Sequence, residues 1–220
     1  MNGHQRVVID STELWLLAEK AVFWPDANTL LVADAHFGKA AVYRSLGQPV
    51  PHGTTDATLR VLGSLMERFP GANVVFLGDF LHGPGALAPT TSASLSRWRD
   101  TFHDHAITVI RGNHDQRAGD PPAALGFNIC DGPLLEGPFA LQHEPVPHPT
   151  HHVLAGHIHP VFQLRGRGRQ RLRLPCFQIG QRMSLLPAFG AFTGGYAVGW
   201  RDDIRLYVVA DGQVWPLDRP

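Results

Sequence analysis

The sequence predicts an α/β fold in which two packed β-sheets are flanked by helices. In the first 127 residues, strand-like apolar runs alternate with segments of helical periodicity. Beyond residue 127 the helical periodicity fades and strand-like segments dominate, so crossover helices belong to the first half and the second half is mostly sheet. With 220 residues, 44% of them hydrophobic, the chain can bury one large core. We therefore expect a single domain over residues 1–220.

Short strands open the chain, and two helices follow. The apolar runs VVID, LWLL, AVFW and TLLVAD are separated by turn-forming residues such as Pro25 and Asn28, and they predict four strands. Apolar residues recur at helical spacing in 54–69 and again in 90–105. The runs NVVFLGD and AITVIRGNHD predict a buried strand after each helix.

The second half of the chain is predicted to consist mainly of strands. Its apolar segments are short and rich in β-branched and aromatic residues, and turn-forming residues bound them. The segments are FNIC, FALQ, HHVLA, VFQLR, RLRLPCFQI, YAVGW and IRLYVVA.

Composition limits the classes of partner and compartment. Nineteen basic and nineteen acidic residues cancel, so an anionic partner must be held by a local group of charges. Cys130 and Cys176 are far apart, which argues against a thiolate metal site and a disulfide framework and favours a reducing cytoplasm. We expect no membrane association, because no apolar run approaches spanning length and the first twenty residues lack a signal-peptide core.

Metal-competent side chains follow five of the predicted buried strands directly. The carboxyl ends of strands are where α/β folds place their sites. A polar residue at the end of a single strand usually has no ligand role. Five strand ends that all carry aspartate, asparagine or histidine indicate one functional cluster. The residues are Asp34 and His36; Asp79; Asn113, His114 and Asp115; His143; and His157 and His159.

This ordered series, D-x-H, G-D, G-N-H-D, H and G-H-x-H, resembles the calcineurin-like metallophosphoesterase superfamily. The resemblance implies a four-layer αββα sandwich and two divalent metal ions. It assigns one ion to Asp34, His36, Asp79 and His159, and the other to the bridging Asp79 with Asn113, His143 and His157. Such ions activate water and neutralise phosphoryl oxygens. The donor set suits manganese, zinc or iron without ranking them chemically; manganese is our expectation.

Two histidines are expected to be catalytic. The resemblance leaves His114 without a metal, free to protonate the departing oxygen. His82 follows Asp79 by three residues in GDFLHG, a spacing similar to the GD-x-x-H of double-strand-break repair nucleases, where the histidine pairs with that of GNHD. The alternative for His82 is a surface position in the turn-like HGPG. Asp115 is expected only to orient its loop.

Longer motifs narrow the resemblance. VADAHFGKAAVYRSLGQPVP, LGDFLHG, QHEP, AGHIHP, RLPCF and LPAFGAFTGG together resemble the bacterial ligase-associated DNA-damage-response phosphoesterases, the PdeM family. The resemblance implies a metal-dependent phosphodiesterase or endonuclease that works beside a DNA ligase and a helicase. Lys39 and Arg44, just after the first motif, are candidates to bind a substrate phosphate; a solvated helix face is the equal alternative.

Five arginines alternate along LRGRGRQRLRLP. Where this chain is extended, their side chains share one face, and two glycines mark a hairpin turn. One interpretation is a track for a phosphate backbone leading to the metals, and the other is an edge strand whose charges prevent pairing with another sheet. The arginines are Arg165, Arg167, Arg169, Arg171 and Arg173.

The sequence thus predicts a two-metal phosphoesterase that cleaves phosphodiester bonds in DNA or RNA and is linked to DNA repair. One alternative is a phosphatase or phosphodiesterase for a small nucleotide or other small phosphoester, which would have a closed pocket and little dependence on the arginines. A non-catalytic scaffold is the other, and His114 with its intact neighbours argues against it. Oligomeric state is not predicted.

Overall fold

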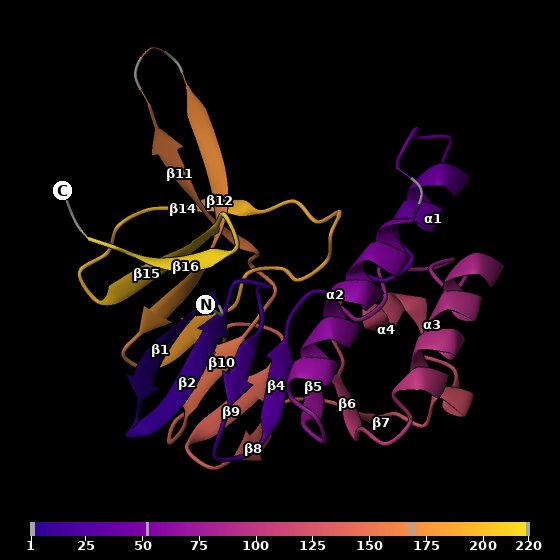
Figure 1. Cartoon of the computed structure of the whole chain (residues 1–220), viewed down its shortest axis with the longest axis horizontal. Helices are drawn as coiled ribbons and strands as arrows, with labels where there is room; N and C mark the ends of the chain where they lie inside the picture. The colour runs from indigo at the N-terminus through magenta and orange to yellow at the C-terminus, as the bar shows by residue number, and fades with distance from the viewer. Residues whose placement is uncertain (1–2, 52, 167, 169, 219–220) are drawn as a thin grey trace.

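The computed structural model describes residues 3–51, 53–166, 168 and 170–218, and in it two β-sheets pack face to face (Figure 1). Within these residues the first sheet has seven strands in sequence order. Its first four strands form an antiparallel meander, and the fourth to the seventh run parallel. They are β1 (His4–Ile9), β2 (Thr12–Leu17), β3 (Val22–Trp24), β4 (Thr29–Val32), β5 (Asn73–Leu77), β6 (Ile107–Ile110) and β7 (Asn128–Cys130).

The second sheet joins nine strands of the described chain. β9 and β10 are parallel neighbours, with β8 at the sheet edge beside β9, and β15 and β16 pair beside β12. The strands are β8 (Leu134–Glu136), β9 (Phe139–Gln142), β10 (His152–Ala155), β11 (Pro160–Arg165), β12 (Arg171–Gly180), β13 (Met183–Leu185), β14 (Tyr196–Val198), β15 (Ile204–Ala210) and β16 (Gln213–Leu217).

Two long helices cover the outer face of the first sheet. α2 (Thr54–Arg68) and α3 (Pro89–Thr101) contact each other and bury their apolar faces against β4, β5 and β6. The predicted second helix was too long, because Arg99 binds the carbonyl oxygens of Phe102 and His105 and turns the chain after Thr101. The short helices are α1 (Lys39–Ser45), α4 (Asp115–Ala118) and a 3₁₀ turn (Ala123–Leu125).

The predicted α/β sandwich of two packed sheets is confirmed; of the four layers that the family resemblance implied, the described residues contain both sheets and the helical layer on the first sheet. The α-helices of the described chain, α1 to α4, lie on one side of the sandwich in Figure 1. On the outer face of the second sheet, Ala140, Val153 and Ala155 pack with Met183 and Leu185, and no helix of the described residues takes part. The reason is visible in the sequence, since helical periodicity is absent beyond residue 127.

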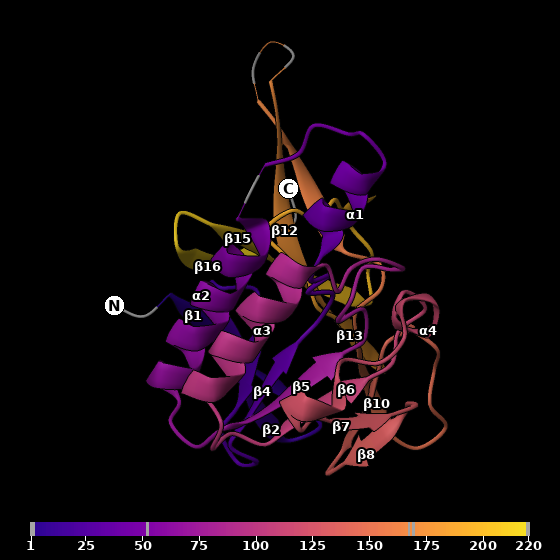
Figure 2. The same ribbon diagram turned by 90° about the vertical axis from the view of Figure 1, so that its right-hand side faces the viewer.

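β11 and β12 extend beyond the second sheet as a two-stranded arm, which projects from the body in two perpendicular views (Figures 1 and 2). β14 pairs only with 160–162 of this arm, and β13 and β15 pair only with 176–180. In the outer part, residues 163–165 and 171–173 therefore pair only with each other among the described residues.

Candidate metal centre

The predicted site residues meet at the carboxyl ends of strands from both sheets. β4, β5 and β6 are parallel neighbours in the first sheet, and β9 and β10 are parallel neighbours in the second. The loops that follow these five strands bring all seven predicted metal ligands into one cluster. They are Asp34, His36, Asp79, Asn113, His143, His157 and His159.

One donor set consists of Asp34, His36, Asp79 and His159, whose ligand atoms lie within 4.8 Å of one another. His36 Nε2 is 3.3 Å from His159 Nε2 and 3.6 Å from Asp79 Oδ2. His159 Nε2 is 3.3 Å from Asp34 Oδ1. Donors on one cation at about 2.1 Å and about 90–110° apart are separated by roughly 3.0–3.4 Å. The set fits a divalent ion.

A second donor set lies on the other side of Asp79. Asn113 Oδ1 is 3.0 Å from His143 Nε2 and 3.1 Å from His157 Nδ1, and these two nitrogens are 3.0 Å apart. Asp79 Oδ1 is 3.4 Å from His143 Nε2. Asp79 therefore presents Oδ2 to the first set and Oδ1 to the second, which is the placement that a bridging carboxylate requires.

The backbone is strained at most of these positions. Positive φ angles, between 48° and 68°, occur at five of the seven candidate ligands, and none of the five is glycine or asparagine. Such conformations cost on the order of 1–3 kcal/mol each and persist where the surroundings impose them, frequently at functional sites. The five are Asp34, His36, Asp79, His157 and His159.

Two motif glycines permit close approach of a neighbouring carboxylate. A Cβ on Gly156 would lie 2.5 Å from Asp34 Oδ2, and one on Gly112 would overlap Asp79 Oδ1. Backbone N–H groups then hold the carboxylates: His157 N donates to both oxygens of Asp34, at 3.1 and 3.0 Å, and His114 N donates to Asp79 Oδ1 at 2.9 Å. Glycine is required at these positions because side-chain oxygens occupy the space.

The cluster is deeply buried, and burial shifts the pKa values of its ionisable groups. Asp34 is fully buried, and Asp79 and His36 are 2% and 4% exposed. Burial raises the pKa of Asp79, against the opposing effects of His143 and the His114 N–H. Burial, followed by neighbouring His159 and Lys39, lowers the pKa of His36. His36 is therefore neutral, the form in which imidazole binds a metal.

His114 and His82 are adjacent, as the sequence predicted. Their rings stack with centroids 4.9 Å apart, and His114 Nδ1 donates to the carbonyl oxygen of His82. The other nitrogen of His114, Nε2, is 4.0 Å from Asp79 Oδ2 and so faces the cluster. His82 Nδ1 is 3.3 Å from His36 Nδ1. Burial, then Lys39 and His114, lowers the pKa of His82 to about 4, so this ring is neutral.

Asp115 is an orienting residue, as expected. Its buried carboxylate accepts hydrogen bonds from Phe80 N, Leu81 N and Gly112 N, at 3.1, 2.7 and 3.0 Å. These bonds tie the loop after β6 to the loop after β5 and fix His114 relative to Asp79.

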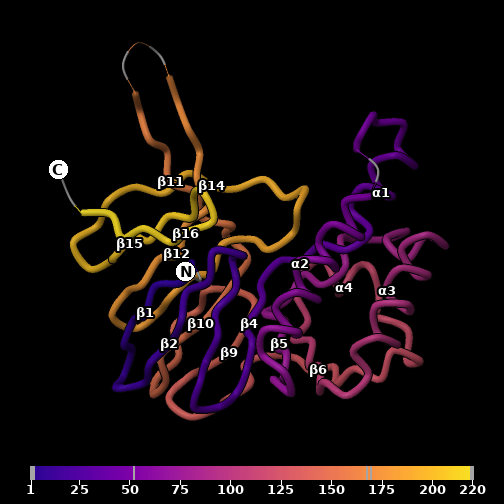
Figure 3. Tube along the Cα trace, viewed as in Figure 1, coloured from indigo at the N-terminus to yellow at the C-terminus, as the bar shows by residue number. Residues whose placement is uncertain are grey.

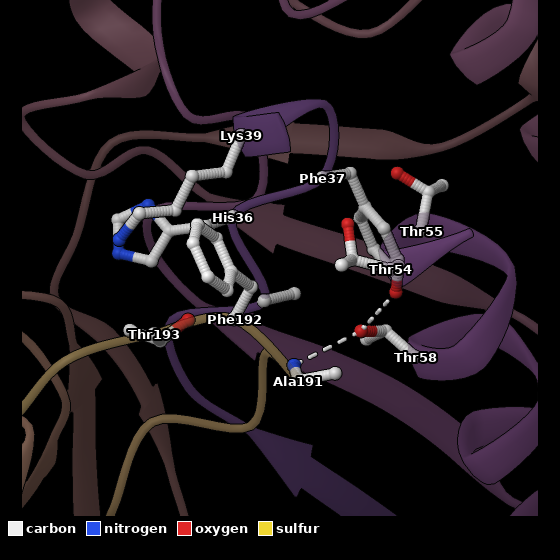
Figure 4. A pocket seen from close by; sticks show the side chains of 10 residues that line it. His36, Phe37, Lys39, Thr54, Thr55, Thr58, Ala191, Phe192 and Thr193 are labelled. Atoms are coloured by element: carbon white, nitrogen blue, oxygen red, sulfur yellow. Dashed lines mark hydrogen bonds between the residues drawn. The ribbon is translucent and has the colours of Figure 1, made fainter. Parts of the chain in front are cut away.

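Lys39 and Arg44, two of the candidate phosphate-binding residues, differ in their distance from the cluster. Lys39 lines a small pocket with His36 (Figure 4), and burial lowers its pKa against the attraction of Asp79. Arg44 donates to the carbonyl oxygen of Pro51 at 3.3 Å, and no described contact joins it to the cluster. The structure therefore brings Lys39, but not Arg44, to the centre.

Three of the five predicted arginines are described and exposed, and they share one face of the arm. Arg165 is opposite Arg171, and Arg173 is opposite Gln163 on the same face. Arg173 also donates to the carbonyl oxygen of Gly195. Arg167 and Arg169 lie outside the described residues. The other face of the arm carries Leu164 and Leu172, which are both exposed.

Sequence reasoning gave no role to Tyr43 or to the loop between β13 and β14. This loop reaches from the second sheet towards α1 and α2 (Figure 3), and Phe192 in it lines the same pocket as His36 and Lys39 (Figure 4). The motif LPAFGAFTGG was the available signal, because two phenylalanines among small residues are unusual for a solvent loop.

The fold and the cluster define a metallophosphoesterase. The model of the calcineurin-like phosphoesterase family matches residues 27–173, and the chain belongs to this family, whose members use a divalent metal centre. Among solved structures, the chain is similar to the crystal structure of Pseudomonas putida nuclease MPE, with 49% sequence identity and a TM-score of 0.86 over 97% of this chain and 100% of that one. No curated protein matches the chain.

Proposed function

We propose that this phosphoesterase is a two-metal phosphodiesterase that hydrolyses nucleic acid, with residues 1–220 acting as one domain. The observation that carries the proposal is the division of the donor atoms into two sets around Asp79, with Oδ2 of Asp79 near His36 of one set and Oδ1 near His143 of the other. Divalent ions bridged by one carboxylate are suited to an in-line displacement at phosphorus.

Seven residues would hold the two ions. Asp34, His36, Asp79 and His159 would hold one; Asp79, Asn113, His143 and His157 would hold the other. Imidazole, carboxylate and amide donors without thiolate suit manganese, our first choice, and also zinc or iron. When bound, the ions supply Lewis-acid activation of water and charge neutralisation at the phosphoryl oxygens.

His114 is the proposed general acid. Its Nδ1 is engaged by the His82 carbonyl oxygen, so its other nitrogen, Nε2, is the one that can give a proton to the leaving oxygen. His82 is a positioning residue, because it holds His114 through a carbonyl group and a stacked ring.

Two observations support nucleic acid as the substrate. The similar solved structure is that of a nuclease. In addition, the β11–β12 arm starts directly after His159 and carries exposed arginines in its outer part, the first of them Arg165, in a chain without net charge. The arrangement matches a basic track for a phosphate backbone. We further propose that the protein acts in DNA repair beside a ligase and a helicase, and that it does so in the cytoplasm. In the described part of the chain, no helix is long and apolar enough to cross a membrane.

Activity assays on defined substrates test the proposal. We expect hydrolysis of single-stranded DNA, duplex DNA or RNA and of bis-aryl phosphodiesters, with manganese supporting higher rates than zinc, iron or magnesium. Hydrolysis of phosphomonoesters alone would replace the proposal by the small-phosphoester alternative. No phosphodiester hydrolysis with any of the four metals would refute it.

A further inference from the structure

A cavity of about 550 Å³ opens beside the candidate metal centre, between α1 and the loop that joins β13 to β14. A pocket of this size accommodates a nucleoside. It is next to the centre because Lys39, Phe192 and Thr193 line it and also line the smaller pocket that contains His36 (Figure 4). The cavity is lined by Lys39, Tyr43, Gln48, Val50, Ala191, Phe192, Thr193 and Gly194.

Two aromatic rings form the walls of this cavity. Phe192 is 36% exposed, and its ring centroid lies 6.3 Å from that of Tyr43 at an interplanar angle of 87°. The Tyr43 ring lies 5.5 Å from the ring of His82, which stacks on His114. A row of rings therefore leads from His114 through His82 and Tyr43 to Phe192, and the cavity lies on the side of the centre that carries these two histidines.

The loop that carries Phe192 is fixed relative to the metal ligands. Phe189 N donates to the carbonyl oxygen of Ala33 at 2.8 Å, and Gly190 N donates to that of Asp34 at 3.2 Å. Ala191 N donates to Thr58 Oγ1 at 3.1 Å, which attaches the loop to α2. Phe192 thus stands on a positioned segment, and a base stacked on it would lie at a defined distance from the scissile phosphate.

We propose that this cavity is a nucleoside subsite of the phosphodiesterase, and that it holds the base of the nucleoside which leaves. Phe192 supplies the stacking surface and Tyr43 borders it. The Gln48 amide offers a donor and an acceptor to the base edge, and Lys39 meets the adjoining phosphate. The inference rests on the proposed function, because it takes a phosphodiester as substrate and His114 as the acid.

A second aromatic groove provides a comparison. This groove, of about 650 Å³, contains Tyr196 and Trp200. Its arginines are already engaged: Arg201 pairs with Asp203, and Arg182 donates to the carbonyl oxygens of His148 and Pro149. It therefore offers aromatic rings without a free cation, and its residues serve as matched controls.

An abasic residue in the substrate tests the subsite. A short oligonucleotide of the kind that wild-type protein cleaves receives one abasic residue at its centre, and the end groups of the products identify the leaving nucleoside. We expect cleavage of the linkage whose leaving nucleoside is abasic to fall roughly 5- to 150-fold, the range for loss of one base–aromatic stack. The linkage on the other side of the abasic residue should be cut at the rate of the intact oligonucleotide.

Variants locate the effect. Phe192→Leu should slow cleavage of the intact substrate by a similar factor and remove the discrimination against the abasic residue, with its metal content unchanged; Trp200→Leu should keep both rate and discrimination. Equilibrium binding to the metal-loaded protein provides a second measurement, in which wild type but not Phe192→Leu should prefer a nucleoside monophosphate over deoxyribose 5-phosphate.

Three results would overturn the subsite: equal cleavage on both sides of the abasic residue, discrimination on the opposite side, or full discrimination in Phe192→Leu. Failure of the proposed function looks different, because wild-type protein would then cleave no phosphodiester at all.

Discussion

Asp79 is the residue on which the two-metal arrangement depends. Its Oδ2 is 3.6 Å from His36 Nε2, and its Oδ1 is 3.4 Å from His143 Nε2, so one carboxylate serves both donor sets. His159, in contrast, contributes only to the set that contains Asp34. The two residues therefore differ in the number of ions that each would affect.

We expect Asp79→Asn to weaken both ions and His159→Ala to weaken mainly one. The amide loses the negative charge that offsets repulsion between the cations, and its NH₂ end is a donor that cannot bind a metal. The loss should exceed the roughly 10- to 100-fold reduction in affinity typical of groups that only orient a ligand. Metal analysis after dialysis measures this, and two full equivalents in Asp79→Asn would disprove the bridge.

His114→Ala should retain both metals and lose activity by about 10²–10⁴-fold, the range for a general acid. The loss should be greatest for natural phosphodiesters, whose alkoxide leaving group needs a proton, and smallest for aryl phosphodiesters with a good leaving group. Parallel kcat/KM measurements on the two substrates check this. An equal loss on both would mean that His114 does not act as the acid.

Gly156→Ala should disturb the metal centre although it replaces no ligand. The added methyl group would lie 2.5 Å from Asp34 Oδ2, a separation at which the carboxylate has to move. We expect reduced metal content, mainly at the ion held by Asp34. Gly199→Ala is the matched control, because its Cβ meets no atom within 4 Å and should leave metal content unchanged.

At the scale of elements, the β11–β12 arm combines two unfavourable features. Arg165 and Arg171 face each other across the strands, although like charges in direct opposition destabilise a sheet. Leu164 and Leu172 on the other face are exposed. The positive charge would serve both interpretations of the arginines, a track for a phosphate backbone and an edge strand protected from pairing with another sheet.

Replacing Arg165 and Arg171 together by glutamine tests the phosphate track. If each arginine contacts one phosphate, the slope of log affinity against log salt should become smaller in magnitude by roughly 1.4 on single strands, at about 0.7 per contact. Stability should stay the same or rise, because the repulsion is gone. Arg60 and Arg205, exposed elsewhere, form the control pair. An unchanged slope in the arm variant would identify the arm as an edge whose charges prevent sheet pairing.

Elements with strong local signals were predicted well, and those defined by distant contacts were not. The apolar spacing of 54–69 matches α2 within one residue. α3 ends four residues before the predicted end because Arg99 binds carbonyl oxygens beyond it, including that of Leu125, and no local pattern encodes this contact. β8 and β13 have only three residues each, too few for a periodicity.

The candidate site was more predictable than the elements around it. Seven proposed ligands converge because each follows a buried strand, and parallel strands bring their carboxyl ends together. The cavity beside the site was not predictable, because its walls come from α1 and from a loop about 150 residues further along the chain. The loop is held in place by its hydrogen bonds to Ala33, Asp34 and Thr58, which link the two halves of the chain.

A half-buried cation, Lys20, should make the stability of the whole molecule depend on pH. Lys20, in the turn between β2 and β3, donates to the carbonyl oxygen of Phe189 at 2.8 Å and so ties the first sheet to the loop that passes Asp34. Burial lowers its pKa from 10.5 to about 8. Between these values the unfolded chain holds a proton that the folded chain has lost, so the free energy of unfolding should rise as pH increases from about 8 to 10.5.

Lys20→Met should remove this rise. A full shift is equivalent to about 3 kcal/mol, and we expect about 2 kcal/mol because the side chain keeps some contact with water. Urea unfolding of both proteins at several pH values between 7 and 10.5 measures the difference, and subtracting one curve from the other cancels groups that titrate in both, such as tyrosines. If the two curves run parallel, Lys20 remains fully protonated in the folded protein, and its bond to Phe189 is made by an ordinary, hydrated ammonium group.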